Sequence, residues 1–281
     1  MANEKQKDYW THGVVKKWLR VAEEMEARFA DINALIKTQA ALQPGERVLD
    51  IGCGPGTTSL MAASCVGPTG FVCGVDISAP MLEVAQQKAA QAGVSQVEFA
   101  LADAQTEQFS PAFDVLISRF GVMFFDDARA AMANLRRSVS AHGRLVFAVW
   151  GPLAENEHWR RPLEIAQGLV GAGAGRHPHA PGPMSFADAA YAQSVFTQAG
   201  WQQVEVTKTK IWLHGASLAH EAQMASVLGP AAALLEEKKA PEEVYEQARA
   251  LFKEALPDYA ETLPDGQIRL AATLNIITAR A

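Results

Sequence analysis

The sequence predicts an α/β protein built on a doubly wound, mostly parallel sheet of seven strands. Between residues 44 and 150, short apolar segments alternate with helical segments, and a glycine-rich turn follows the first apolar segment. Apolar strands joined through helices form parallel sheets that are covered on both faces. Because such crossovers are right-handed, the topology is doubly wound.

The N-terminal segment, about residues 12–41, is predicted to be helical. Apolar side chains recur there at steps of three and four residues, with charged residues between them. These apolar residues are Val15, Trp18, Leu19, Ala22, Met25, Phe29, Ile32 and Ile36. Pro44 and Gly45 then interrupt the chain. We expect residues 1–43 to form a helical lid.

The central segment, residues 44–150, contains the first five predicted strands. They span residues 47–51, 71–75, 97–101, 113–118 and 143–149. Helices are predicted over residues 79–92, which Gly93 closes, and about 127–139.

The C-terminal part, residues 151–281, is expected to hold a cap insertion, the last helices and the strands that complete the sheet. Residues 151–185 are rich in glycine and proline, so much of this stretch is predicted to be irregular. Helices are expected over about 187–199 and 218–256, and strands over 204–213 and 268–279.

The composition limits which partners the protein can bind and in which cellular compartment it is expected. The net charge is −6 and no long basic stripe is present, which argues against a nucleic-acid partner. The three cysteines match no zinc pattern, so no metal is expected. No apolar run approaches the roughly 20 residues of a membrane span, and the charged N-terminal segment lacks a signal peptide's apolar core. We expect a cytoplasmic protein; the oligomeric state is not indicated.

The glycine-rich turn reads Gly52-Cys53-Gly54-Pro55-Gly56, with Thr57 or Thr58 as candidate N-cap of the next helix. Dinucleotides and S-adenosylmethionine both bind at such turns. Asp50, two residues before the first glycine, would repel a pyrophosphate and attract an ammonium group. No Lys or Arg occurs between residues 48 and 87, and the spacing is G-x-G-x-G instead of G-x-G-x-x-G. These features favour S-adenosylmethionine.

Two further carboxylates follow predicted strands. Asp76 ends the second strand, where an acid can accept hydrogen bonds from both ribose hydroxyls of either cofactor class. Asp103 follows the third strand and can accept from an adenine amino group. A lone acid after a strand is also a common structural feature, so Asp103 is the less specific of the two.

Five segments, in order, resemble class I S-adenosylmethionine-dependent methyltransferases, more closely the branch similar to ubiquinone/menaquinone C-methyltransferases. They are VLDIGCGPGTTS, GVDISAPML, FALADAQ, FDVLISRFGVMFF and LRRSVSAHGRLVFAVW, and the resemblance covers about residues 44–150. It implies a Rossmann-like fold and S-adenosylmethionine as the cofactor. It also implies a set of binding positions: Asp50, Gly52, Gly54 and Gly56 for the methionine end, Asp76 and Ile77 for the ribose, Met81, Asp103 and Ala104 for the adenine, and Ser118 and Arg119 near the sulfonium.

The predicted reaction is methyl transfer by in-line displacement, which needs positioning more than it needs a general base. Weak candidates for a base are His12, His158, His177, His179 and Tyr9. Trp10 and Trp18 are candidate lid residues.

The acceptor is predicted to be a small aromatic, quinone-like or isoprenoid molecule. The residues after the fourth strand lack the Asn/Asp-Pro-Pro-aromatic signature of amide or adenine nitrogen methylation. Apolar side chains instead indicate a pocket, for which we name Phe120, Met123, Phe124, Trp150 and Trp159. Two alternatives stay open at this point: a module that binds the cofactor without methyl transfer, and an NAD(P)-dependent oxidoreductase.

Overall fold

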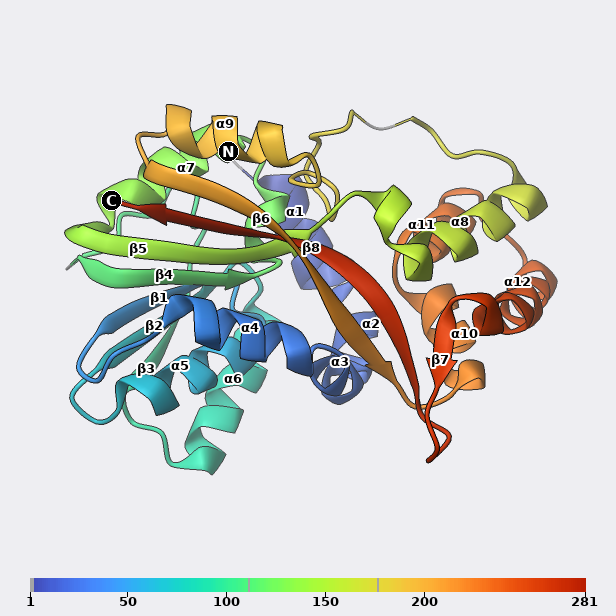
Figure 1. Cartoon of the computed structure of the whole chain (residues 1–281), viewed down its shortest axis with the longest axis horizontal. Coiled ribbons are helices and arrows are strands. Elements are labelled where there is room, and N and C mark those ends of the chain that lie inside the picture. Colours follow the sequence, from blue (N-terminus) through green and yellow to red (C-terminus); the bar gives the residue numbers. More distant parts are fainter. Residues whose placement is uncertain (1–2, 111, 176) are drawn as a thin grey trace.

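The computed structural model describes residues 3–110, 112–175 and 177–281 and shows an open α/β sheet with helices on both faces (Figure 1). The sheet of the described residues has eight strands in the order β3-β2-β1-β4-β5-β8-β6, with β7 paired to β8. The strands are β1 (Arg47–Ile51), β2 (Phe71–Asp76), β3 (Val97–Leu101), β4 (Phe113–Arg119), β5 (Val139–Trp150), β6 (Gln202–Gly215), β7 (Ala260–Thr262) and β8 (Ile268–Arg280).

The first five strands are parallel to one another. Strand β8 lies between β5 and β6 and is antiparallel to both. The predicted doubly wound, mostly parallel α/β fold is therefore confirmed. The main path contains the seven predicted strands. The additional strand, β7, has three residues, and its Ala-Glu-Thr sequence shows no apolar pattern.

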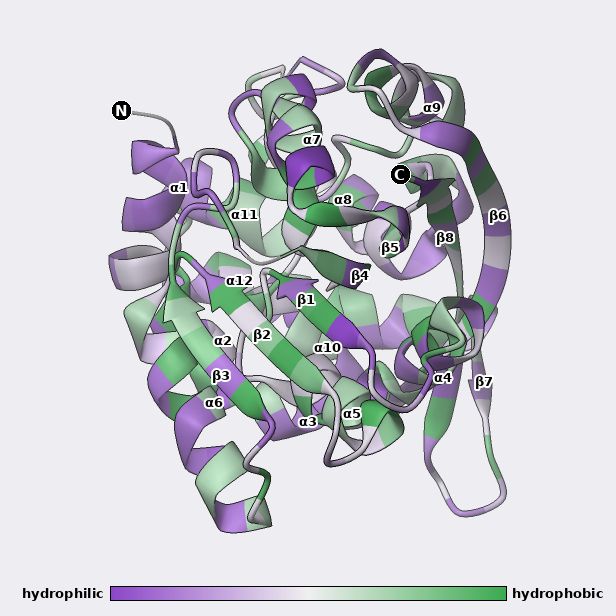
Figure 2. Ribbon diagram, turned by 90° about the vertical axis from the view of Figure 1, so that its left-hand side faces the viewer, coloured by the Kyte–Doolittle hydropathy of each residue, from purple (hydrophilic) through white to green (hydrophobic). Residues whose placement is uncertain are grey.

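Helices cover the sheet in two layers (Figure 1). One face carries α4 (Ala30–Ala40), α5 (Thr57–Val66) and α6 (Ala79–Ala92), and the other carries α7 (Ala128–Arg137) and α9 (Ala189–Gln198). The strands between these layers are mainly hydrophobic, as Figure 2 shows for β1 and β2. Val48, Leu49 and Ile51 of β1 are almost fully buried, as expected for a parallel strand covered on both sides.

The N-terminal segment is a series of short helices instead of the single helix predicted over residues 12–41. They are α1 (Glu4–Asp8), a π-helical turn η1 (Tyr9–Gly13), α2 (Val15–Arg20), α3 (Ala22–Arg28) and α4. The breaks fall at Val21 and Phe29, whose backbones leave the helical region. Phe29 contacts Phe120 and Trp150, at ring centroid distances of 5.4 and 6.2 Å. No proline or glycine marks these breaks, so the periodicity could not reveal them.

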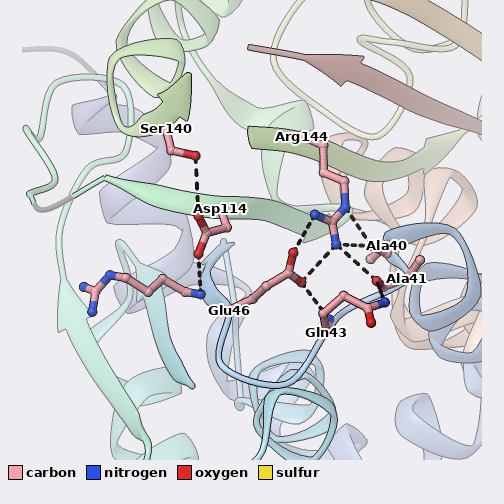
Figure 3. Close-up of polar contacts among 8 residues, drawn as sticks. Ala40, Ala41, Gln43, Glu46, Asp114, Ser140 and Arg144 are labelled. Atoms are coloured by element: carbon pink, nitrogen blue, oxygen red, sulfur yellow. Dashed lines mark hydrogen bonds and ion pairs between the residues drawn. The ribbon is translucent and has the colours of Figure 1, made fainter. Parts of the chain in front are cut away.

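Arg144 of β5 fixes the C-terminal end of α4 to the sheet (Figure 3). Its guanidinium donates to the backbone oxygen of Ala40 at 2.7 and 2.9 Å and to that of Ala41 at 3.2 Å. It also forms a two-bond ion pair with Glu46, at 2.7 and 3.0 Å. A cation at unsatisfied carbonyl groups stabilises a helix C-terminus, so this contact anchors the last helix before β1.

A cluster of four helices lies beyond the parallel strands, where the long strands β6 and β8 extend past the rest of the sheet (Figure 1). It consists of α8 (Glu157–Val170), α10 (Leu218–Val227), α11 (Pro230–Glu237) and α12 (Glu242–Ala255). The expectation of irregular structure was wrong for residues 157–170, because α8 accommodates Pro162. Arg160 pairs with both Glu157 and Glu164 along this helix, contacts that stabilise helical structure.

Three single-turn helices complete the described elements: η2 (Gly121–Phe124), η3 (Leu153–Glu155) and η4 (Leu256–Asp258). Across the described ranges, every helix is too short or too polar to cross a bilayer.

Ion pairs connect the N-terminal helices to the helical cluster and to β6. Arg28 of α3 forms a two-bond ion pair with Glu221 of α10, at 2.5 and 2.8 Å, and both side chains are buried. Lys17 and Glu236 form an exposed pair at 3.0 Å. The buried pair carries the larger energetic consequence, because a charge left without its partner away from water is costly.

We predict that Glu221→Gln lowers the free energy of unfolding by about 3–5 kcal/mol, since it leaves the Arg28 guanidinium buried without a counter-charge. Urea denaturation measures this change. The matched control is Glu236→Gln in the exposed pair, for which we expect less than about 1 kcal/mol. Equal losses of unfolding free energy in the two variants would contradict the larger contribution assigned to the buried pair.

Candidate active site

A cavity that is open to solvent at its mouth lies at the carboxyl ends of the parallel strands. The chain order reverses there between β1 and β4, the position at which open α/β sheets bind ligands. Residues from three regions line it: the N-terminal segment (Asn3, Gln6, Trp10, Trp18 and Phe29), the segments at the ends of β1 to β3 (Ile51, Gly52, Cys53, Gly54, Pro55, Thr58, Val75, Asp76, Ile77, Met81, Ala102, Asp103 and Ala104) and the end of β4 (Arg119, Phe120, Gly121, Phe124 and Phe125).

Two glycines bring the ends of β1 and β4 into backbone contact. A Cβ atom on Gly52 would lie 2.6 Å from the Cα of Gly121, and one on Gly121 would lie 2.4 Å from the oxygen of Ile51. Gly52 also has a φ of +65°. No side chain fits at either position, which explains the first glycine of the turn.

The predicted ribose carboxylate, Asp76, faces the cavity and braces the glycine turn. Its Oδ2 accepts from the N–H of Gly54 and its Oδ1 from the N–H of Ser78, both at 2.8 Å. Burial raises the pKa of Asp76, and these N–H groups partly counteract the rise. Gly54 has a φ of +52° and no atom within 4 Å of a Cβ built on it, so its backbone is open to the cavity.

Asp50 lies beneath the turn and not on the cavity surface. Its Oδ2 accepts from the hydroxyls of Thr58 and Ser59, at 2.6 and 2.7 Å. Its buried Oδ1 has no hydrogen-bond partner among the described residues. Burial raises the pKa of Asp50 to about 6. The predicted N-cap was wrong: Gly56 precedes α5, and the Thr58 hydroxyl binds Asp50 instead.

At the exit of β4, Ser118 and Arg119 differ in position. Ser118 is fully buried, its hydroxyl donates to the backbone oxygen of Ile51 at 2.7 Å, and it does not line the cavity. Arg119 lines the cavity and forms a two-bond ion pair with Glu26, at 2.7 and 2.9 Å, plus a hydrogen bond to Asn33. Gly56, the third glycine, packs against Ala85 and also lies off the cavity surface.

Of the named pocket residues, Phe120 and Phe124 line the cavity. Phe120 stacks on Trp150 at 4.5 Å with an interplanar angle of 6°, and Trp150 contacts Trp159 at 4.5 Å. Trp150 and Trp159 therefore form layers behind Phe120 and do not line the cavity; Met123 is buried in the core. Phe120 has a φ of +69°, and backbone strain of this kind in a non-glycine residue is concentrated at functional sites.

Within the described ranges, the five candidate bases do not line the cavity. His158 is buried against Trp150 and Trp159, and burial followed by the nearby Arg28 charge lowers its pKa well below the usual value. His179 stacks on Tyr191 at 3.6 Å. The others lie at the surface, namely His12, His177 and Tyr9.

Comparison with known proteins identifies the domain that carries this cavity. The sequence profile of a family described as a methyltransferase domain matches residues 48–143, which include the glycine turn, Asp76 and Asp103. Residues 48–143 are therefore similar to a methyltransferase domain, in agreement with the resemblance to class I S-adenosylmethionine-dependent methyltransferases seen in the sequence. The match supports S-adenosylmethionine, the cofactor expected from the sequence, as the cofactor of this domain.

Two relatives illustrate the similarity of the methyltransferase domain. Aklanonic acid methyltransferase DauC from Streptomyces sp. (strain C5) is 38% identical over 104 residues, 37% of this chain and 47% of that protein. The ubiquinone/menaquinone biosynthesis C-methyltransferase UbiE from Ralstonia pickettii (strain 12J) is 38% identical over 120 residues, 41% of this chain and 49% of that protein. The chain thus spans about half the length of the curated relatives that it matches.

Solved structures share the fold over a larger part of the chain. The YcgJ protein from Bacillus subtilis has a TM-score of 0.55 at 20% identity and covers 88% of this chain and 97% of its own. Phosphoethanolamine N-methyltransferase 2 from Haemonchus contortus, solved with S-adenosylmethionine, has a TM-score of 0.52 at 19% identity and covers 89% of this chain and 52% of its own. At these identities the likeness shows the fold alone.

The residues of this chain suit such a cofactor. A buried carboxylate with one unsatisfied oxygen, Asp50, lies below the turn, while the open backbone of Gly54 and the carboxylates of Asp76 and Asp103 border the cavity. Anionic groups without an opposing lysine match a cationic amino acid end and a hydroxyl-bearing nucleoside.

Several cavity residues were not predicted, namely Asn3, Gln6, Phe29 and Phe125. In the sequence, Phe29 was only one apolar position of a predicted helix. Its place at the cavity goes with the break in that helix, which the sequence did not indicate. Asn3 and Gln6 lie in a charged segment without periodicity, so no local signal could have placed them over the strand ends.

We predict that Asp50 makes the fold less stable as pH rises. Its pKa is about 6 in the folded protein against an ordinary 3.8, so the folded state binds this proton more tightly than the unfolded chain does. The cost develops between about pH 4 and 6 and is complete above 6, at about 3 kcal/mol.

Urea denaturation of Asp50→Asn and the parent chain without ligand, at a series of pH values, tests this prediction. The stability of the variant relative to the parent should increase from pH 4 to 6 and then level off. A difference independent of pH between 4 and 8 would show that Asp50 titrates normally.

Proposed function

We propose that the chain catalyses methyl transfer from S-adenosylmethionine to a small, uncharged, aromatic, quinone-like or isoprenoid acceptor. One observation carries the proposal: a single cavity joins the glycine turn, Asp76 and Asp103 to a group of aromatic side chains. The aromatic part is formed by Trp10, Trp18, Phe29, Phe120, Phe124 and Phe125. A cofactor and an apolar acceptor can therefore occupy one enclosure side by side.

The residues of the chain position and enclose the reactants. When bound, S-adenosylmethionine supplies an activated methyl group for in-line displacement. Asp76 would hold the ribose, and the open backbone of Gly54 would admit the methionine end. Trp10 and Trp18 of the N-terminal helices cover the cavity, where they exclude water from the displacement.

The charge of the cavity favours an acceptor without an ionic group. Arg119 is the cation among the cavity residues of the described chain, and Glu26 and Asn33 already accept three hydrogen bonds from its guanidinium. An anionic acceptor would have to compete with Glu26, whose carboxylate makes two bonds to Arg119. Aromatic stacking on Phe120, backed by Trp150, is available to a neutral ring.

The same residues argue against a protein base next to the acceptor. The titratable side chains of the cavity in the described residues are Cys53, Asp76, Asp103 and Arg119. Burial and the neighbouring carboxylates raise the pKa of Cys53 well above its ordinary value, so its thiol stays protonated. We propose an acceptor whose nucleophilic atom reacts without a base from the chain.

One relative supports this substrate class. It is named for ubiquinone/menaquinone biosynthesis, and ubiquinone and menaquinone are uncharged quinones. The cytoplasmic location expected from the sequence stays a prediction.

The experiment has two stages. Calorimetric titration with S-adenosylmethionine, S-adenosylhomocysteine and NAD⁺ should show binding of the first two and not of the dinucleotide. Incubation with methyl-labelled cofactor and an extract fractionated for small molecules should then transfer label to apolar fractions. Tight binding of NAD⁺ alone would overturn the family assignment of the site, and binding without any label transfer would favour the nonenzymatic alternative.

We predict that Asp76→Ala weakens S-adenosylhomocysteine binding about 100-fold, because the variant loses charged hydrogen bonds to the ribose and its support of Gly54. Calorimetry measures the affinity. Glu98→Ala, an exposed acid on the adjacent strand β3, is the matched control and should leave the affinity unchanged. Unchanged affinity in Asp76→Ala would show that the ribose lies elsewhere.

A further inference from the structure

Asn3, the residue before α1, has an unusual conformation and unusual partners. It is almost fully buried, at 2% exposure, and its φ is +54°. Asparagine at this position of a helix normally caps the first turn with its side chain. The Asn3 side chain makes no such bond to its own helix. Its polar atoms are used elsewhere.

Three hydrogen bonds of Asn3 cross to the rim of the cavity, in addition to the helical bond that its backbone oxygen accepts from Lys7. Its backbone N–H donates to Oδ2 of Asp126 at 2.8 Å, and its Oδ1 accepts from the N–H of Asp126 at 2.7 Å. Its Nδ2 donates to Oδ1 of Asp103 at 2.7 Å. Asp126 follows η2 at the exit of β4, and Asp103 follows β3. Asn3 therefore connects the start of the lid to two strand exits that are far away in sequence.

The contacts leave one oxygen of Asp103 available. Oδ1 accepts from both Asn3 Nδ2 and the N–H of Gln105, at 2.7 and 2.9 Å. Across residues 3–110, 112–175 and 177–281, no protein group donates to Oδ2, and Asp103 lines the cavity. The carboxylate is thus held in one orientation through one atom, while its other atom can accept a hydrogen bond from a ligand.

A second contact attaches the same segment to the other nucleoside carboxylate. The hydroxyl of Ser78 donates to the backbone oxygen of Trp10 at 2.7 Å, while the N–H of Ser78 donates to Asp76. Trp10, the second attachment point, and Gln6, which lies between Asn3 and Trp10 in the sequence, both line the cavity. Residues 3–10 therefore lie along this part of the cavity and are attached to Asp103 directly and to Asp76 through Ser78.

We propose that Asn3 is a positioning residue for the adenine end of the cofactor: it orients Asp103 so that Oδ2 accepts the 6-amino group, and it links closure of residues 3–10 to recognition of that group. The inference rests on the proposed function, because it assumes that Asp103 meets adenine. Asparagine suits the position because it tolerates a left-handed backbone and supplies an amide donor that aspartate lacks.

The test compares S-adenosylhomocysteine with its 6-oxo analogue, in which inosine replaces adenosine, by calorimetry on the full chain. The parent protein should prefer the adenine compound. Asn3→Ala should lower affinity for that compound about tenfold and affinity for the 6-oxo analogue less than twofold, since one hydrogen bond to a charged group is lost. The preference between the two ligands should fall accordingly.

A second variant and a control keep the result interpretable. Asn3→Asp retains the size and backbone tolerance of the side chain but turns its donor into a like charge beside Asp103, so its preference should fall at least as far. Glu4→Gln, at the exposed neighbouring position, should match the parent. Thermal unfolding of each variant shows whether it is folded.

The outcomes separate the two hypotheses. Equal weakening of both ligands would show that Asn3 only covers the cavity, and parental affinities in both Asn3 variants would show that it does nothing for binding; either result overturns the positioning role alone. A parent protein that binds neither ligand would overturn the proposed function together with this inference.

Discussion

The backbone contact between Gly52 and Gly121 is the constraint on which the cavity depends. Parallel neighbours β1 and β4 end at the same edge, and their chains then leave in opposite directions. Because neither glycine has a side chain, the two exits touch, and the space above them remains open for a ligand. The polar groups that border this space lie at neighbouring strand ends, Asp76 at the end of β2 and Arg119 at the end of β4.

The site separates two kinds of carboxylate by their surroundings. Asp50 is enclosed beneath the turn with hydroxyl partners on one oxygen only, and its charge is costly there. Asp76 and Asp103 stand at the cavity surface, where backbone N–H groups hold each of them in place. The buried Asp50 carboxylate can attract a cationic ligand electrostatically without contacting it. Asp76 and Asp103, at the cavity surface, can accept directional hydrogen bonds.

The elements that could be predicted from the sequence are those marked by residues close together in the chain. The five parallel strands, the turn and α6 follow from apolar runs and glycines; the bounds of the first four strands and of α6 agree within one residue, whereas β5 begins four residues earlier than predicted. Asp76 and Asp103, which the sequence placed after strands, lie at the cavity because the carboxyl ends of parallel strands converge at one edge, and so do Ile77, Met81 and Ala104, which the resemblance implied. Their roles toward a ligand stay predictions.

Features that depend on contacts distant in sequence could not be predicted. The break at Phe29 accompanies the packing of its ring against Phe120 and Trp150, which are distant in sequence, and Pro162 concealed helix α8. Trp150 and Trp159 were expected in the pocket, yet they lie behind Phe120. The sequence does not distinguish a hydrophobic residue that lines a cavity from one that packs behind the lining.

The antiparallel strand β8 has a consequence for how the molecule assembles. It lies between β5 and β6 and hydrogen-bonds to both, although it is the last strand of the sheet in chain order. Before β8 is in place, two strand edges expose unpaired N–H and C=O groups, which are templates for association with other chains. Closing the sheet through such distant pairs is slow, so a newly made or partly unfolded chain passes through a stage in which aggregation competes with folding.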